Sequence, residues 1–280
     1  MYLSWGSTYL AIRIALTELP PLFLMGIRFF LFGIGIYVFL RMRGAPNPTL
    51  REWSWSTVIG TFLMLGGSAS VACAEQWVSS GLAALVIATT PIWTVLFAGI
   101  WKRWPNRIEW LGLLMGLAGI AVLNFEGDLR ASPLGAGLLI LAAMSWAFGS
   151  AWSQHLSLPK GMMSGAAQMI TGGVMVLLTS LAAGERIAAM PTWRSLSAVL
   201  YLGIVGSLVG FSAYVYLLNR VRPALATSYA YVNPVIAVLL GMWLLGERIH
   251  TTGMIAMAII LSGVVLVVLG QMRYRKGSRK

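Results

Sequence analysis

Residues 60–67 read GTFLMLGG, and residues 203–210, 143 positions further along the chain, read GIVGSLVG. The same offset relates Pro91 to Pro234, and an offset of 141 relates Ser4-Trp5 to Ser145-Trp146. Matched glycines and prolines are informative because each has a specific consequence for the backbone, which matched aliphatic residues do not. We therefore predict that the chain is built from two related halves.

The composition is that of a membrane protein. Of the 280 residues, 58% are hydrophobic and only 10% are charged, and the mean hydropathy is +0.80. A soluble protein of this length would need many more charges on its surface, so we expect its solvent to be the lipid bilayer. The single cysteine, Cys73, excludes a disulfide framework, and two histidines are too few for a dedicated metal site. We expect no cofactor and no metal.

Apolar windows of about 20 residues, the length that crosses a bilayer, occur throughout the chain. They fall near residues 21–40, 56–75, 81–101, 108–124, 134–153, 164–183, 196–217, 224–245 and 252–272. A shorter one covers residues 1–17 and lacks the charged start and the cleavage site of a signal peptide. We interpret it as a clipped first span. The chain is thus predicted to be an all-α integral membrane protein with ten transmembrane helices.

The two predicted repeats are residues 1–126 and 133–272, each with five spans, followed by a basic tail at 273–280. Because five is odd, the second repeat must cross the bilayer in the opposite orientation to the first. Inverted repeats of this kind are the ground plan of transporters that work by alternating access.

The basic residues predict the orientation. The net charge is +12, and most of the 20 lysines and arginines fall on the side of the bilayer that holds the C-terminus. Basic residues in short loops stay in the cytoplasm, so both termini are predicted to be cytoplasmic, in the inner membrane of a bacterium. These residues are scattered between apolar segments and form no soluble basic face, so we expect no nucleic-acid partner.

The matched prolines, Pro91 and Pro234, lie near the middle of their predicted spans. A proline there leaves a backbone carbonyl without its donor, which is tolerated where the helix lines a polar cavity or another helix compensates. One interpretation is a gating bend beside the substrate path, with Thr90, Tyr231 and Asn233 as polar contacts. A packing kink is the other.

Aromatic and neutral polar residues supply the other candidates for substrate binding. Trp146 lies at mid-depth in its span and Trp5 is its equivalent, so we expect both to line a cavity and not the membrane interface. Tyr9 follows Trp5 by one helical turn, on the same face. Gln168 and Tyr214 are further candidates, although polar groups in spans also serve only to bond neighbouring helices.

Arg13, Arg28 and Glu75 are the charges closest to or within the spans. An ionisable residue in a membrane is costly and needs a partner or a wet cavity. A salt bridge between Arg28 and Glu75 that braces the outer side is one hypothesis. The other is that Glu75 is a proton-coupling carboxylate whose pKa responds to burial and to arginine.

The motif Gly112-x-x-x-Gly116 gives the span at 108–124 a face of small residues, which lets helices approach closely. This face would allow a homodimer. The last span has a small face of its own at Ala256 and Gly263, so we expect the two spans to pack within one chain and the protein to be a monomer.

Several motifs resemble one known family. They are Trp5-Gly6-Ser7-Thr8-Tyr9, Trp146-Ala147-Phe148-Gly149-Ser150, and the long segment 223–235 that ends in Asn233-Pro234-Val235. Together they resemble the EamA family of the drug/metabolite transporter superfamily and, within it, the YedA-type exporters. The resemblance implies a ten-helix inverted-repeat bundle, a central cavity near the midplane, and export of small metabolites. Family members carry further residues before the Trp-Gly-Ser-Thr motif, in line with a clipped first helix.

The predicted function is therefore secondary active export of small metabolites, amino acids or drugs by alternating access, with proton exchange as the driving force. The expected partners are a small-molecule substrate and the lipid bilayer, and the substrate is expected to be neutral, zwitterionic or amphipathic. A lipid or metabolite facilitator or channel without proton coupling is the alternative. An enzyme is not expected, because the two histidines fall in loops on opposite sides and no serine-histidine-acid set can form around them.

Overall fold

The structure, a computed structural model, describes residues 2–78, 80–101, 104–124, 133–188, 190–221 and 223–245, and part of 251–270, namely 251, 254–255, 258–259, 261–263, 265–267 and 269–270. All regular secondary structure in these residues is helical, with no strand among them. The predicted all-α class is confirmed for this part of the chain.

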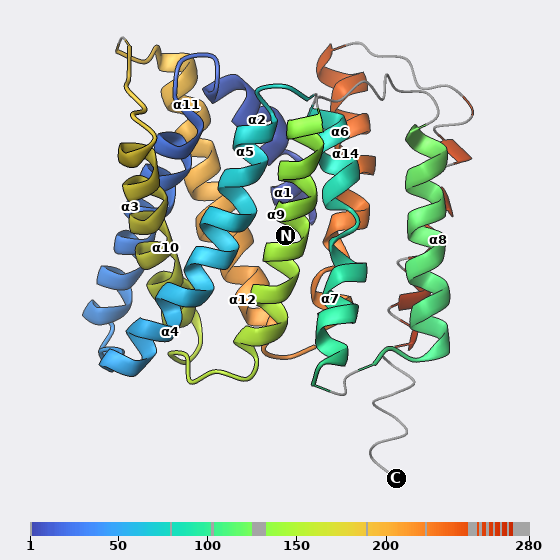
Figure 1. Ribbon diagram of the computed structural model, residues 1–280, viewed down its shortest axis with the longest axis horizontal. Helices are drawn as coiled ribbons and strands as arrows, with labels where there is room; N and C mark the ends of the chain where they lie inside the picture. Colours follow the sequence, from blue (N-terminus) through green and yellow to red (C-terminus); the bar gives the residue numbers. More distant parts are fainter. Residues whose placement is uncertain are drawn as a thin grey trace.

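The helices follow one another with short connections and stand side by side in a single bundle (Figure 1). Up to residue 124 they are α1 (Tyr2–Gly6), α2 (Thr8–Ala15), α3 (Pro21–Met42), α4 (Leu50–Gly60), η1 (Thr61–Ala69), α5 (Ser70–Ala74), α6 (Ser80–Ile87), α7 (Thr90–Gly99) and α8 (Arg107–Asn124). From residue 133 they are α9 (Pro133–Ser153), α10 (Met162–Ala182), α11 (Trp193–Tyr201), η2 (Leu202–Phe211), α12 (Ser212–Leu218), α13 (Pro223–Ala226) and α14 (Tyr229–Leu245).

Within the described residues, five helical stretches are long and apolar enough to cross a membrane. They are Pro21–Met42, Leu50–Ala74, Pro133–Ser153, Met162–Ala182 and Trp193–Leu218. Two of the five are composite: Leu50–Ala74 joins α4, η1 and α5, and Trp193–Leu218 joins α11, η2 and α12. These stretches agree with five of the predicted windows. The total of ten spans stays a prediction.

Two predicted spans are each divided into two helices. The window 81–101 breaks at residues 88–89, and Pro91 lies in the first turn of α7, where its missing N–H costs nothing. The window 224–245 breaks at 227–228, whereas Pro234 lies inside α14. The matched prolines therefore have different roles, one at a helix start and the other within a helix.

The two matched glycine-rich stretches form the two π-helices. Gly60 directly precedes η1, and the sequence at 203–210 lies wholly within η2. π-Helical segments are rare and occur mostly where function requires a local change of backbone geometry. The two π-helices contain matched positions of the sequence, which makes them candidates for a functional site.

Helices α3 and α10, which hold equivalent places in the two halves, pack closely along their lengths. A Cβ atom at Gly173 would lie 2.6 Å from the Phe30 nitrogen, and one at Gly26 would lie 2.7 Å from Leu177 Cγ. Only glycine permits this approach, which is how membrane helices gain close packing.

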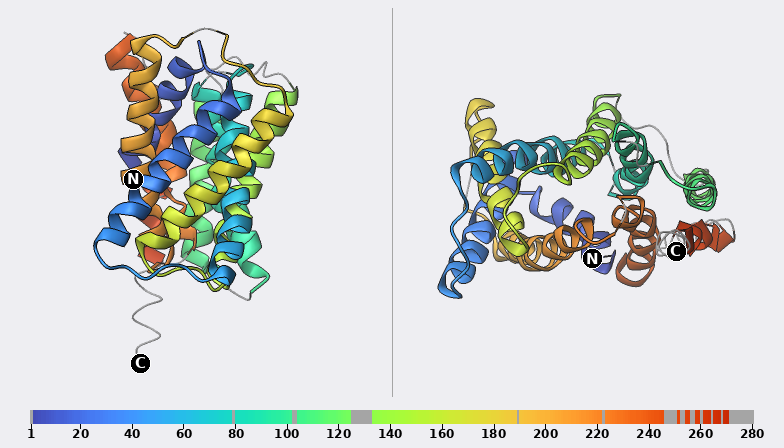
Figure 2. Two further views of the ribbon diagram at one scale, coloured as in Figure 1. Left: turned by 90° about the vertical axis from the view of Figure 1, so that its left-hand side faces the viewer. Right: turned by 90° about the horizontal axis from the view of Figure 1, so that it is seen from below.

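At the other end of the bundle, α8 meets residues of the last predicted span (Figure 2). A Cβ at Gly112 would lie 2.6 Å from the Gly263 carbonyl oxygen, and one at Gly263 would lie 2.7 Å from that of Gly112. The small-residue faces thus pack within one chain at these positions. Ala256, predicted to belong to the same face, lies outside the described residues.

Acidic loop residues connect the halves at one end of the bundle. Glu185, just after α10, accepts hydrogen bonds from the backbone N–H groups of Leu22 (3.1 Å) and Phe23 (2.7 Å) in the first turn of α3. Glu18, just before α3, accepts from the backbone N–H of Thr192 (2.7 Å), the N-cap residue of α11. Each carboxylate therefore satisfies free N–H groups at the start of a helix in the other half.

Candidate substrate site

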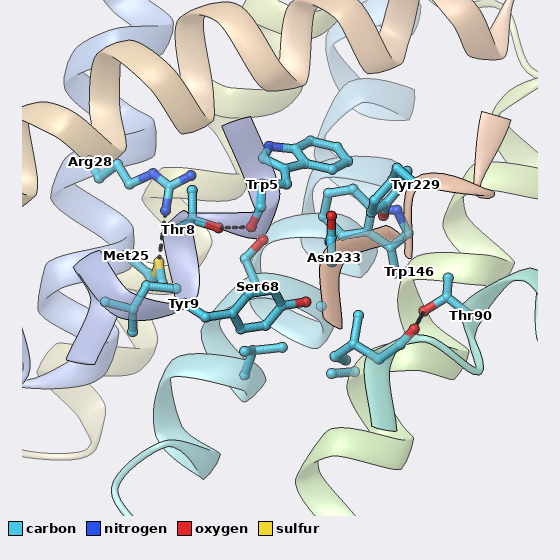
Figure 3. Close-up of a pocket in the computed structure, with 15 residues that line it drawn as sticks. Trp5, Thr8, Tyr9, Met25, Arg28, Ser68, Thr90, Trp146, Tyr229 and Asn233 are labelled. Atoms are coloured by element: carbon cyan, nitrogen blue, oxygen red, sulfur yellow. Dashed lines mark hydrogen bonds between the residues drawn. The ribbon is translucent and has the colours of Figure 1, made fainter. Parts of the chain in front are cut away.

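A cavity of about 80 Å³ lies inside the bundle, and residues from both halves line it (Figure 3). The lining residues come from α1, α2, α3, η1, α5, α6, α7, α9 and α14. The aromatic ones are Trp5, Tyr9, Trp146 and Tyr229, and the polar or charged ones are Thr8, Arg28, Ser68, Thr90 and Asn233. The cavity thus combines apolar walls with a few polar groups, as small-molecule sites do.

The aromatic wall is a packed cluster centred on Trp5. The Trp5 ring lies 4.5 Å from that of Tyr229, 5.5 Å from that of Trp146 and 5.3 Å from that of Tyr214, measured between centroids. The first two pairs meet edge to face, the arrangement that the charge distribution of aromatic rings favours.

Each tryptophan packs on a glycine of the π-helix in the opposite half. A Cβ at Gly67 in η1 would lie 2.8 Å from Trp146 Cε3, and one at Gly210 in η2 would lie 2.5 Å from Trp5 Nε1. Trp5 Nε1 also donates a hydrogen bond to the Gly206 carbonyl in η2, at 2.9 Å. The matched glycines and the matched tryptophans therefore contact each other reciprocally: the tryptophan of each half packs on the glycine of the other half.

The structure brings half of the predicted site residues to this cavity. Those that line it are Trp5, Tyr9, Arg28, Thr90, Trp146 and Asn233. The remaining ones are buried nearby but are not among its lining residues: Glu75, Pro91, Gln168, Tyr214, Tyr231 and Pro234.

Three of the predicted polar residues outside the lining bond to their neighbours. Tyr214 packs behind Trp5 and Trp146 and shares a short hydrogen bond with Ser150. The amide of Gln168 donates to Ser164 Oγ at 2.9 Å, and the Tyr231 hydroxyl donates to the Leu113 carbonyl at 3.4 Å. The bonds of Tyr214 and Tyr231 connect different helices, the alternative role that polar groups in spans can have, whereas that of Gln168 lies within α10.

The expected salt bridge between Arg28 and Glu75 is wrong. Arg28 Nε instead donates to Ser207 Oγ in η2 at 2.8 Å, and Gly206 leaves room for the guanidinium, since a Cβ there would lie 2.6 Å from Nη2. Both carboxylate oxygens of Glu75 are buried without a hydrogen-bond partner in the described structure. Arg13 donates to the main-chain carbonyl of Val78 at 3.0 Å.

The cavity also contains residues that the sequence reasoning did not select, above all Tyr229, with Thr8 and Ser68. Helical spacing could have identified Tyr229, because residues four apart share a face and Tyr229 is four before Asn233. Tyr231, only two residues before Asn233, lies on a different face of α14 and packs toward α8, near Gly116.

A bundle of apolar helices that encloses a partly polar cavity is the architecture of a multi-pass membrane protein. The chain belongs to the EamA-like transporter family, whose model matches residues 1–125 and 133–269.

Three relatives illustrate the family. The chain is 44% identical over 272 residues to the uncharacterized inner membrane transporter YedA of Escherichia coli, covering 97% of this chain and 89% of that protein. It is 26% identical over 289 residues to a probable amino-acid metabolite efflux pump of Salmonella typhimurium, covering 98% and 94%. It is 25% identical over 268 residues to a probable terminal-alkyne amino-acid exporter of Streptantibioticus cattleyicolor, covering 94% and 89%.

A protein of known crystal structure shares the fold, with a TM-score of 0.80 at 22% sequence identity, over 97% of this chain and 95% of that one. The family and the three relatives are named as transporters and not as enzymes.

Proposed function

We propose that this protein is a secondary active transporter that exports small metabolites, amino acids or drugs across the bacterial cytoplasmic membrane by alternating access. The observation that carries the proposal is the cavity between the halves, held by the reciprocal contacts of Gly67 with Trp146 and of Gly210 with Trp5. Transporters with inverted repeats bind substrate where the repeats meet and open to either side as one repeat moves against the other.

The proposed architecture is ten helices in two inverted repeats, at 1–126 and 133–272, with a cytoplasmic tail at 273–280. The duplicated π-helices support it, and so does the match of the family model to two separate stretches of the chain. Both termini are proposed to be cytoplasmic, since the basic residues concentrate on that side. A reporter enzyme that works only in the cytoplasm should be active when fused to the C-terminus, and a reporter that works only in the periplasm should be inactive there. The opposite result would contradict this orientation.

Amino acids are included among the substrates because two relatives are named as amino-acid efflux proteins. The cavity is compatible with such solutes, because it offers aromatic walls together with the guanidinium of Arg28 and the amide of Asn233.

Proton exchange through Glu75 is the proposed driving force. Glu75 is only 3% exposed, and neither carboxylate oxygen has a hydrogen-bond partner in the described structure. A carboxylate is costly in such surroundings as an anion, so a group there can gain and lose a proton as the surroundings change.

Everted membrane vesicles test the mechanism. Uptake of a radiolabelled amino acid should saturate with concentration and show counterflow. It should also increase when the vesicle interior is more acidic than the outside. The Glu75→Gln variant should retain counterflow but lose the response to the gradient, because glutamine cannot carry the proton. Uptake that rises linearly without counterflow would instead identify a channel, and an unchanged pH response in Glu75→Gln would exclude coupling through this residue.

A further inference from the structure

The cavity contains a buried cation that no described acidic residue neutralises. Arg28 lines the cavity and is 5% exposed, and none of its contacts is with a carboxylate. Glu75, the partner that the sequence suggested for Arg28, is not among the lining residues. A charge buried in a membrane protein is expensive to keep, and uncompensated arginine in such a place indicates a function.

The neighbours of Arg28 orient its guanidinium but do not balance its charge. Ser207 Oγ accepts from Nε at 2.8 Å, Met25 Sδ accepts from Nη1 at 3.6 Å, and the Phe29 ring lies 4.7 Å from Cζ. All three groups are neutral. None of the described residues accepts a hydrogen bond from Nη2, so part of the planar fork that suits a carboxylate remains available.

The other side of the cavity offers unpaired groups of a different kind. Asn233 Oδ1 and Trp146 Nε1 have no hydrogen-bond partner in the described structure, and Asn233 is 1% exposed. The hydroxyls of Thr8 and Thr90 already donate to the carbonyls of Trp5 and Ile87. Figure 3 shows Arg28 on one side of the cavity and Asn233 with Trp146 on the other, with Trp5 and Tyr9 between them.

We propose that the transported solute carries a carboxylate that pairs with Arg28, and a hydrogen-bond donor at its other end that meets Oδ1 of Asn233. A neutral solute would leave the buried guanidinium unpaired, whereas a carboxylate satisfies it. Amino-acid zwitterions and small monocarboxylates with a polar substituent both have this pattern. The inference rests on the proposed transport function and narrows its substrate class, excluding the neutral solutes that the sequence alone allowed.

Matched pairs of ligands test the requirement for a carboxylate. The full chain, purified in detergent, is titrated with the common amino acids and short hydroxy acids, and in parallel with the carboxamide of each. The carboxamide has the same shape without the negative charge. We expect acids to raise the melting temperature and their carboxamides to have no effect. If no acid in the panel binds, or if acids and carboxamides bind equally, the inference is wrong.

Variants of Arg28 test the anchor. Arg28→Gln should weaken binding of the best acid roughly thirtyfold or more, the usual consequence of removing one partner of a buried charge pair. The affinity of Arg28→Lys for the acid should lie between those of the original protein and Arg28→Gln, because lysine keeps the positive charge but not the planar guanidinium. Arg13→Gln is the matched control, since Arg13 is exposed and donates to main-chain carbonyls. An acid preference that survives in folded Arg28→Gln protein would overturn the assignment.

Should Arg28→Gln fail to fold, Ser207→Ala provides the second test. It keeps the charge and removes the acceptor that orients Nε, so acid binding should weaken several-fold with no effect on carboxamides. Unchanged acid binding in Ser207→Ala would count against the assignment. Efflux of neutral solutes without any acid binding would overturn this inference alone. Acid binding without transport in vesicles would overturn the proposed function while supporting the pairing of Arg28 with a carboxylate.

Discussion

At the scale of single residues, the geometry of the cavity depends on two glycines that have no room for a side chain. Gly67 and Gly210 bring the backbone of each π-helix against a tryptophan of the other half. The tryptophans in turn form the wall of the cavity, together with Tyr229. The addition of one methyl group at either glycine should therefore displace a tryptophan of the cavity wall.

We predict that Gly210→Ala destabilises the protein by about 1–3 kcal/mol, the usual cost of overpacking a filled interior. Its Cβ would lie 2.5 Å from Trp5 Nε1, so the indole must move and its hydrogen bond to Gly206 must lengthen. Melting temperature in detergent measures the effect. Gly35→Ala is the control, because nothing lies within 4 Å of a Cβ there. Equal melting temperatures for the two variants would contradict the prediction.

Arg28 shows at the same scale what the sequence can and cannot predict about the site. Its location in an apolar window was enough to select it as a candidate, because charge in a membrane is costly. Its partner was not predictable, since Ser207 is 179 residues away in the sequence and beside Gly206, which leaves room for the guanidinium.

At the scale of elements, helix ends depend on residues from the opposite half. The backbone N–H of Thr192, followed by the hydroxyls of Ser195 and Thr192, lowers the pKa of the exposed Glu18 carboxyl below its ordinary value. The hydrogen bonds anchor the loop before α3 to the start of α11.

We predict a pH-dependent contribution of Glu18 to stability. Because its pKa is lower in the folded state, the contribution is present above the unfolded-state pKa and is lost as pH falls through the folded-state value. Glu18→Gln should therefore melt at a lower temperature than the original protein at pH 7, and the difference should vanish in strongly acidic buffer. Melting curves over this range measure it, and a difference that is constant with pH would show that the charge has no role.

The elements also show where hydropathy stops being informative. It correctly predicted helices in the windows 81–101 and 224–245, but not that each is divided, nor that Pro91 begins a helix while Pro234 lies within one. Likewise, the matched glycines indicated that the segments of η1 and η2 are related, but they did not predict that both are π-helices. A break or a wide turn depends on which neighbours can satisfy the freed backbone groups, and those neighbours are distant in sequence.

At the scale of the whole molecule, close contacts between glycines join the two halves. Gly112 of α8 and Gly263 each face the carbonyl of the other, at the end of the bundle away from α3 (Figure 1). This contact uses the small-residue face of α8 within the chain.

We predict that the purified protein is a monomer in detergent and that Gly112→Val lowers its melting temperature without changing its mass. The valine would collide with the Gly263 carbonyl, 2.6 Å from the new Cβ, and separate α8 from its partner. Light scattering coupled to size-exclusion chromatography measures the mass, and Gly137→Val, at a site with open space, is the control. A dimer that Gly112→Val converts to a monomer would mean that this face joins two copies.

The sequence by itself predicted a membrane protein, its helical windows and six of the fifteen residues that line the cavity. Hydropathy, charge and repeated glycines act locally or by simple periodicity, so they can be read along the chain. Only the tertiary structure decided that Arg28 turns to Ser207 and not to Glu75, that Tyr229 and not Tyr231 faces the cavity, and that each tryptophan meets the other half's glycine. The physical reason is that partners in a bundle are chosen by close packing between helices far apart in sequence, where a single missing side chain determines which groups can meet.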